Sequence, residues 1–223
     1  INAIALARPA EKHIYAHLDF AQLERQLEAA AKSCTRAIVV TDGVFSMRGD
    51  HAPLDKLMDL AARHDANFSE NVVVVVDDSH GVGGFGTTGR GTGEVCGGRP
   101  VDVLIGTLVK AFGVNGGYVT AAAPVIDYLR ETAATYIYSN PITPAEAEAA
   151  RVAVDRVDSQ EGRGQLAHLR AMTAHFRDGL RRLGLETIAG DHPVVPLLVR
   201  DTARTRQLVA NLRGEGILAT GLA

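Results

Sequence analysis

NVVVVVD, at residues Asn71–Asp77, places five valines in a row between two polar residues. A continuous run of β-branched residues is typical of a strand that is covered on both faces, as at the centre of a parallel sheet. Apolar segments at Arg36–Thr41, Val101–Ile105 and Gly117–Ala122 predict three further strands. The valine run therefore predicts the central strand of a sheet.

Helices are predicted between these strands. Ala21–Ser33 and Pro53–His64 each place leucines three or four residues apart, which indicates amphipathic helices. Strands that alternate with helices form parallel βαβ units. The alternation predicts an α/β fold with a mostly parallel sheet and helices on both of its faces.

The pattern changes after residue 143. Two helical segments follow, and the second has leucines at helical spacing as far as Gly184. Beyond it we expect a strand, a helix and a strand, at Pro193–Val199, Thr202–Arg213 and Gly216–Thr220. The prediction is a large domain at residues 1–143, connecting helices at 144–184 and the start of a small α+β domain at 185–223.

The composition argues against several classes of partner. The formal net charge is −3 and no stripe of lysine and arginine is present, so nucleic acid and anionic membranes are not expected partners. No apolar run is long enough to cross a bilayer. Two cysteines, Cys34 and Cys96, are typical of a reduced cytoplasmic protein rather than of a disulfide scaffold. No metal site is predicted.

Polar residues follow the predicted strands, at the edge where open α/β sheets bind ligands. The carboxylate of Asp77 can bind a protonated ring nitrogen, and His80 can reach another edge of the same ring. Lys110 lies between an apolar strand and a glycine-rich turn, where partial desolvation would make its amine a nucleophile toward aldehydes. The alternatives are a solvated strand end and an ordinary surface lysine.

Three hydroxyl groups are further candidates. Thr107 can bind a phosphate, Ser46 follows the first strand within TDGVFSM, and Ser139 lies in the segment Tyr138–Pro141. Each also has a simpler interpretation, because a threonine hydroxyl often satisfies backbone groups and serines are common in turns.

One motif favours a different function. Gly81–Gly86 (GVGGFG) matches the G-x-G-x-x-G fingerprint of dinucleotide-binding proteins, which would make the chain a NAD-type oxidoreductase. That fingerprint works only where a helix begins within it. Turn-forming residues (TTGRGTG) follow here, and four polar residues separate the strand from the first glycine. We therefore expect no dinucleotide site.

These segments together resemble the α-oxoamine synthases, a family of fold-type-I (aspartate aminotransferase-like) enzymes that use pyridoxal 5'-phosphate (PLP). The similar segments are, in order, TDGVFSMRGD, VDDSHGVGGFGTTGRG, IGTLVKAFGVNGGY and YIYSNPITPA. The resemblance runs from about Asp19 to Gly221. It implies the fold of a fold-type-I PLP-dependent transferase.

The resemblance also implies a role for each candidate residue. Lys110 would hold PLP as a Schiff base and later transfer the α-proton of the substrate. Asp77 would keep the pyridine nitrogen protonated, which makes the ring an electron sink. His80 would bind the phenolic oxygen of the ring, Ser46 would support the same edge, and Thr107 would bind the phosphate.

The reaction implied by the resemblance joins an amino acid to an acyl-CoA and gives an α-amino ketone or a 2-amino-3-keto acid. The family forms homodimers, in which Ser139 would reach the phosphate bound by the other subunit. Asp77–His80 is most similar to members that use glycine and acetyl-CoA, whereas Gly49–Leu54 is more similar to the branch of biotin synthesis, which uses alanine and a pimeloyl thioester. We expect glycine and acetyl-CoA, with alanine and the pimeloyl thioester as the alternative.

The ends of the chain indicate part of a larger protein. The ring-stacking histidine and the phosphate loop of the family would precede Ile1, and the arginine that binds the substrate carboxylate would follow Ala223. Val109 stands beside the lysine where the family has a small residue. We expect the full-length protein to be an active enzyme, with a non-catalytic relative as the remaining alternative.

Overall fold

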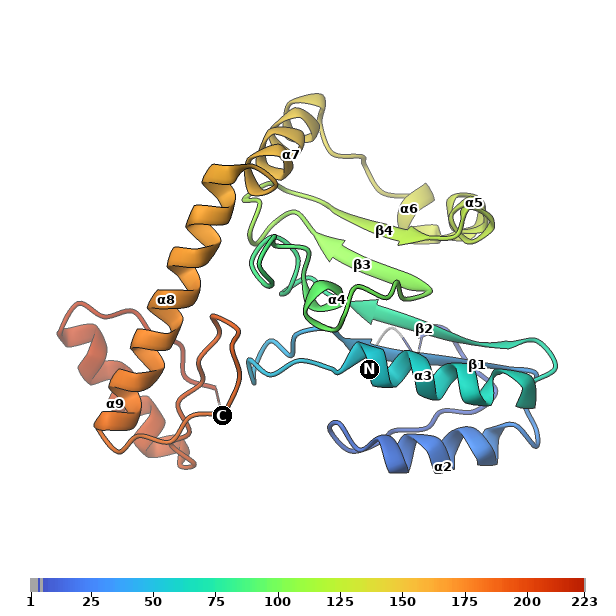
Figure 1. Ribbon diagram of the computed structural model, residues 1–223, viewed down its shortest axis with the longest axis horizontal. Coiled ribbons are helices and arrows are strands. Elements are labelled where there is room, and N and C mark those ends of the chain that lie inside the picture. The colour runs from blue at the N-terminus through green and yellow to red at the C-terminus, as the bar shows by residue number, and fades with distance from the viewer. Residues whose placement is uncertain (1–3, 5, 223) are drawn as a thin grey trace. The chain divides into compact units, whose positions relative to one another are not determined.

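The computed structural model describes residue 4 and residues 6–222 (Figure 1). The chain forms two compact units. The first holds the described residues up to 46 together with residues 51–168, and the second holds residues 47–50 and 169–222. The first unit carries the sheet and all six of the predicted site residues.

The first unit is built on four strands: β1 (Arg36–Asp42), β2 (Asn71–Asp77), β3 (Val103–Thr107) and β4 (Gly117–Ala121). Their spatial order is β1-β2-β3-β4 (Figure 1). β1 is parallel to β2 and β2 to β3, whereas β4 is antiparallel to β3. The predicted mostly parallel α/β sheet is therefore confirmed.

The third strand starts two residues later than predicted. Asp102 precedes it, and its carboxylate accepts a hydrogen bond of 2.7 Å from the amide of Val74. A side chain thus occupies the position at which a backbone carbonyl would otherwise continue the β2–β3 ladder. The strand begins only after this residue.

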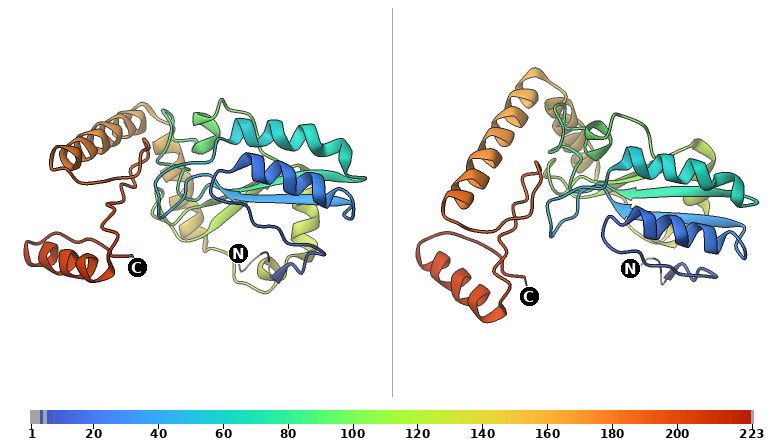
Figure 2. Two further views of the ribbon diagram at one scale, coloured as in Figure 1. Left: turned by 90° about the horizontal axis from the view of Figure 1, so that it is seen from below. Right: turned by 60° about the horizontal axis from the view of Figure 1, so that its bottom comes forward.

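The main core lies between the sheet and two helices, α2 (Phe20–Ala30) and α3 (Leu54–His64). Figure 2 shows these helices side by side on one side of the strands. Every second side chain of a strand faces them. In β2 these side chains are Val72, Val74 and Val76, of which the last two are completely buried.

The opposite face of β1 and β2 is less well covered. Ile38 and Val40 are 62% and 41% exposed, and Val73 and Val75 are half-buried. In the described part of the chain, the cover over β1 and β2 is thus complete on the face of α2 and α3 and incomplete on the other. The valine run could not distinguish these faces, because it is apolar on both.

The remaining helices of the first unit follow the strands. One of them, α7, begins with a capping box, in which Thr143 accepts from the amide of Glu146 and the Glu146 carboxylate accepts from the amide of Thr143. The division between the two units falls between residues 168 and 169, within α8. Besides α2 and α3, the described helices with residues in the first unit are η1 (Asp65–Asn67), α4 (Thr92–Val95), α5 (Ala123–Thr132), α6 (Ala134–Ile137), α7 (Pro144–Val157) and α8 (Gln160–Arg182).

The second unit contains the rest of α8 and α9 (Thr202–Gly214). Arg177 of α8 is buried, and its guanidinium group donates to the carbonyl oxygens of Ile188, His192 and Val194. These bonds fix the segment that follows the helix. No helix in the described part of the chain is long and apolar enough to span a membrane.

Two strands predicted for the second unit are not formed. Within the described residues, Pro193–Val199 contributes only a single bridge, between Thr187 and Leu197, and Gly216–Thr220 has no strand structure. Two prolines in the first segment lack the N–H groups that a ladder needs. The prediction of both strands from apolar pattern was wrong, and the prolines account for the first of the two.

Candidate active site

Two carboxylates lie side by side where β1 and β2 end. Asp42 and Asp77 are register partners in the parallel pair, so their side chains lie on the same face of the sheet. This face is opposite to α2 and α3, because Val76, which alternates with Asp77, is buried in the core. The amide of Ser79 donates to Oδ1 of Asp77 over 3.0 Å, which holds one carboxylate oxygen in place.

Lys110 lies in the loop between β3 and β4, three residues after β3 ends. Backbone hydrogen bonds from Leu108 N to Gly116 O (3.0 Å) and from Val114 N to Leu108 O (2.9 Å) close this loop. Because β3 is parallel to β2, the loop emerges at the same edge of the sheet as the end of β2. The sequence-predicted position of the lysine, between a strand and a glycine-rich turn, is therefore confirmed.

The structure does not confirm the predicted desolvation of Lys110. Lys110 is exposed, and its neighbour Val109 is 58% exposed, whereas Leu108 is buried. The strand end turns one apolar side chain inward and the next two residues outward, so the described chain leaves the amine in solvent.

Asp42, Asp77, His80 and Lys110 lie close enough together to influence one another electrostatically. Burial lowers the pKa of His80, as does the positive charge of Lys110, while Asp42 and Asp77 act in the opposite direction. Burial and the negative charge of Asp77 raise the pKa of Asp42, and His80 and Lys110 oppose this shift. The fold therefore brings three of the predicted site residues into one cluster, together with Asp42.

The three predicted hydroxyl groups, of Thr107, Ser46 and Ser139, are not part of this charged cluster. Thr107 ends β3 at the same edge of the sheet, but its hydroxyl donates to Gly116 O and accepts from Val109 N, each over 3.3 Å. Ser46 lies in an exposed turn after β1. Ser139 is exposed just after α6, and its hydroxyl donates to the carbonyl oxygen of Thr135. The cofactor roles of these residues stay predictions.

The clustered residues fit PLP. The cofactor is a pyridine aldehyde, which needs a primary amine at its aldehyde carbon and a carboxylate at its ring nitrogen. Lys110 offers the amine, Asp77 the carboxylate and His80 a hydrogen-bonding group for a further edge of the ring, all at one edge of the sheet.

Two acidic residues of this region are not among the predicted site residues. Asp42 follows a strand end just as Asp77 does, and the parallel alignment of the two strands would have revealed it. Asp78 is completely buried and accepts hydrogen bonds from Thr92 N (2.7 Å) and Thr92 Oγ1 (2.6 Å). The sequence does not show that Asp78 is buried, because in DDSH it is only the second of two adjacent acidic residues.

Gly91, which precedes α4, tests how tightly this carboxylate is enclosed. Its φ is +81°, and a Cβ atom there would lie 2.1 Å from Oδ2 of Asp78. Gly93 has no heavy atom within 4 Å of its Cβ position. We expect Gly91→Ala to lower the free energy of unfolding by about 3 kcal/mol, because overpacking and backbone strain add. Gly93→Ala should change it by less than about 1 kcal/mol.

Denaturant unfolding of the two variants measures this difference. Equal stabilities for Gly91→Ala and Gly93→Ala would show that the Asp78 carboxylate is not held in the described position.

The glycine-rich loop does not have the geometry of a dinucleotide site. No helix begins within Gly81–Gly86 in the described chain, because α4 starts only at Thr92. The Glu94 carboxylate accepts from the amides and hydroxyls of Thr87 and Thr88 and from the amide of Arg90. Burial raises the pKa of Glu94, but these bonds outweigh it and lower the pKa to about 2. A protein carboxylate thus binds the backbone and hydroxyl donors that directly follow the glycines.

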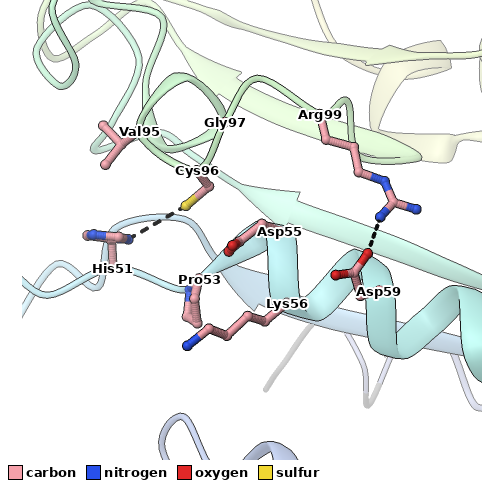
Figure 3. A pocket seen from close by; sticks show the side chains of 9 residues that line it. All are labelled: His51, Pro53, Asp55, Lys56, Asp59, Val95, Cys96, Gly97 and Arg99. Atoms are coloured by element: carbon pink, nitrogen blue, oxygen red, sulfur yellow. Dashed lines mark hydrogen bonds and ion pairs between the residues drawn. The ribbon is translucent and has the colours of Figure 1, made fainter.

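A shallow hollow of about 550 Å³ lies between α3 and α4 (Figure 3), and Asp77, His80 and Lys110 are not among the residues that line it. Figure 3 shows the His51 ring directed toward the Cys96 thiol, with 3.9 Å between Nδ1 and Sγ. The lining residues are His51, Pro53, Asp55, Lys56, Asp59, Val95, Cys96, Gly97 and Arg99. The hollow therefore belongs to the packing of α4 and not to the candidate cofactor site.

Comparison with known families gives one match over almost the entire chain. Residues 1–222 match the family described as aminotransferase class I and II. An 8-amino-7-oxononanoate synthase from Thermosipho melanesiensis is 37% identical over 100% of this chain and 54% of its own length. Another from Marinobacter nauticus is 41% identical over 93% of this chain and 50% of its own length. The chain spans about half the length of these relatives.

Solved structures share the fold. A serine palmitoyltransferase from Sphingomonas wittichii has a TM-score of 0.81 and 26% identity, over 92% of this chain and 50% of its own. A serine palmitoyltransferase from S. paucimobilis with a bound PLP–myriocin aldimine has a TM-score of 0.82 and 25% identity, over 92% of this chain and 51% of its own. The predicted fold-type-I architecture is confirmed by these similarities.

The comparisons also bear on the predicted branch of the family. The relatives are named for 8-amino-7-oxononanoate synthesis, so they favour the alternative drawn from Gly49–Leu54 over the glycine and acetyl-CoA reading drawn from Asp77–His80. The chain belongs to the class I and II aminotransferase family, in its α-oxoamine synthase branch.

Proposed function

We propose that the full-length protein is a PLP-dependent acyltransferase of the α-oxoamine synthase type, which joins an amino acid to an acyl thioester. The observation that carries this proposal is the cluster of Asp77, His80 and Lys110 at one edge of the sheet. Its support from the comparisons is a related structure that holds PLP and relatives that are synthases of an amino keto acid.

Each residue of the cluster has a distinct task. PLP, when bound, supplies an electron sink for negative charge at the α-carbon of the substrate. The Asp77 carboxylate keeps a proton on the ring nitrogen, which maintains that sink. Lys110 Nζ would hold the aldehyde carbon of the cofactor, and the same amine would move the α-proton of the substrate. The lowered pKa of His80 favours a neutral imidazole, whose N–H could donate a hydrogen bond to the ring.

For substrates, we propose alanine and a pimeloyl thioester. The name of the relatives states the product, 8-amino-7-oxononanoate, a nine-carbon acid with an amine next to its ketone. A thioester of a seven-carbon dicarboxylic acid supplies the carbons up to the ketone. The two remaining carbons and the amine are those of alanine after loss of CO₂. Condensation with release of the thiol and CO₂ therefore accounts for every atom of the product.

Parallel assays of the full-length protein with two substrate pairs test this choice. We expect alanine with pimeloyl-CoA to give thiol release at a kcat/KM at least about 100-fold above that of glycine with acetyl-CoA, since a pocket that fits a long chain discriminates by several methylene groups. The detection of 8-amino-7-oxononanoate by mass spectrometry identifies the product. Faster turnover of glycine with acetyl-CoA would reverse the assignment while leaving the acyltransferase function intact.

We also propose that the protein acts as a homodimer in the cytoplasm. The segment that carries Ser139 is apolar and exposed: Tyr136 is 63%, Ile137 48% and Tyr138 87% exposed. Exposed apolar groups of this kind mark protein contacts, and in a dimer Ser139 would reach the phosphate of the partner subunit. Cys34 and Cys96 are unpaired thiols, as expected in a reducing compartment.

A further inference from the structure

Asp78 joins three segments of the first unit through one carboxylate. Both of its side-chain oxygens accept hydrogen bonds from Thr92, the first residue of α4. Its amide donates to the carbonyl oxygen of Ile105 in β3 over 2.9 Å. Its own carbonyl oxygen accepts from the amide of Gly81 over 2.9 Å, which closes a turn around Ser79 and His80.

Three glycines enclose this carboxylate. A Cβ atom at Gly43, Gly81 or Gly91 would lie 2.2, 2.2 or 2.1 Å from an oxygen of Asp78. Gly43 directly follows Asp42, and Gly81 directly follows His80. The backbone on either side of the catalytic cluster is therefore packed against Asp78, with no room for even a methyl group.

Filling space does not explain why this residue is acidic. Burial and, to a smaller extent, the negative charge of Asp77 raise the pKa of Asp78, which shows that the surroundings penalise its charge. The bonds from Thr92 N and Oγ1 oppose this shift most strongly, and the charge of His51 opposes it less. An apolar residue of similar size would avoid the cost. A carboxylate is directional, however, and its two bonds to Thr92 allow the turn only one orientation.

We propose that Asp78 and Thr92 form a clamp that positions Asp77 and His80 toward the cofactor ring. Asp77 precedes the clamp, and its Oδ1 is held by the amide of Ser79, inside the turn that Asp78 closes. His80 is the next residue of that turn. A rotation of Asp78 would therefore move the ring-nitrogen ligand and the imidazole together. Asp78 and Thr92 act through these residues and do not touch the cofactor themselves.

The inference rests on the proposed PLP function and is tested in the full-length protein. Thr92→Val keeps the shape of the side chain and removes the donor at 2.6 Å, whereas Thr92→Ser keeps that donor. Glu94→Gln is the matched control, because Glu94 lies on the same helix and binds residues 87, 88 and 90 instead of the turn 78–81. Each variant is examined for its PLP dissociation constant, for the pH dependence of the visible absorption of bound PLP, and for thermal unfolding of the apoprotein.

We expect Thr92→Val to raise the PLP dissociation constant about tenfold, the effect of roughly one lost hydrogen bond to a charged group. It should also shift the pH at which the visible band changes, since Asp77, with Asp42, His80 and Lys110 around it, no longer faces the ring nitrogen in one position. Thr92→Ser should restore both properties. Glu94→Gln should leave both unchanged even where it lowers the unfolding temperature.

Wild-type PLP affinity and a wild-type pH profile in Thr92→Val would overturn the clamp and leave the proposed function standing. Equal spectral changes in Glu94→Gln and Thr92→Val would also overturn it, because the effect would then follow stability alone. If Thr92→Val does not fold, Asp78→Asn, which keeps the shape of the side chain and loses one acceptor, carries the same test. A wild-type protein that takes up no PLP would reject the proposed function and the clamp with it.

Discussion

Lys110→Ala in the full-length protein is expected to remove the visible absorption of bound PLP and to lower synthase activity by about 10³-fold or more. The variant loses the amine that binds the aldehyde carbon of the cofactor and the group that moves the substrate proton, and proton transfer alone contributes about 10²–10⁴-fold. Absorption spectra and a thiol-release assay measure the two effects. Lys110 is exposed in the loop after β3, so the fold should tolerate the change.

Lys56→Ala is the matched control. Lys56 is an exposed lysine of the same unit, on α3, and lines the hollow between α3 and α4 rather than the cluster at the sheet edge. It should keep the colour and the activity of the wild type. An unchanged spectrum in Lys110→Ala would mean that another amine holds the cofactor.

Asp77→Asn is expected to lower kcat by about 100-fold or more, with a smaller change in KM. The substitution keeps the shape of the side chain but removes the negative charge that holds a proton on the ring nitrogen, and preorganised charges of this kind contribute about 10²–10³-fold in an active site. The amide of Ser79 can still donate to the remaining side-chain oxygen, so the turn should persist. Steady-state kinetics with saturating PLP separate the loss of rate from a loss of cofactor.

Asp42→Asn controls for the position of the charge. Asp42 is the register partner of Asp77 on β1 and lies on the same face of the sheet. Its loss should reduce kcat far less, because only Asp77 is proposed to face the ring nitrogen. A rate loss in Asp42→Asn as large as that in Asp77→Asn would show that the roles of the two carboxylates have been exchanged.

The strands of the sheet could be predicted from sequence because their signals are local. The valine run of β2 matches its observed bounds, Asn71–Asp77, and helices α2 and α3 follow the predicted leucine spacing. The parallel pairing then follows from the alternation of strands and helices. Since parallel strands end at the same edge of a sheet, the sequence was sufficient to predict that Asp77 and Lys110 lie at the same edge.

Features that depend on packing between distant segments could not be predicted. The hydrogen bond from the Val74 amide to the Asp102 carboxylate precedes β3, which begins later than predicted, and no local sequence pattern indicates this bond. The burial of Asp78 depends on Thr92, fourteen residues away, and on three glycines from separate segments. The exposure of Lys110 also depends on how the β3–β4 loop is folded, which an apolar strand followed by glycines does not specify.

The second unit shows where apolar pattern fails. Pro193–Val199 is apolar enough for a strand, but strand structure also needs a partner that provides hydrogen bonds. In the described residues its only strand pairing is a single bridge, between Leu197 and Thr187. Helix α9 of the same unit and helix α8, which leads into it, were predicted, because their hydrogen bonds are internal to each segment.

The central claim, that Lys110 carries the cofactor, is tested most directly by chemical trapping. Borohydride reduction of the PLP-loaded protein makes the carbon–nitrogen bond permanent, and peptide mass spectrometry then locates the pyridoxyl group. This chain contains four lysines, Lys12, Lys32, Lys56 and Lys110. We predict the modification on Lys110, in the tryptic peptide that runs from Gly91 to Arg130, since trypsin cleaves neither the Arg99–Pro100 bond nor the chain after a modified lysine. A pyridoxyl group on any other lysine, or on none, would contradict the account.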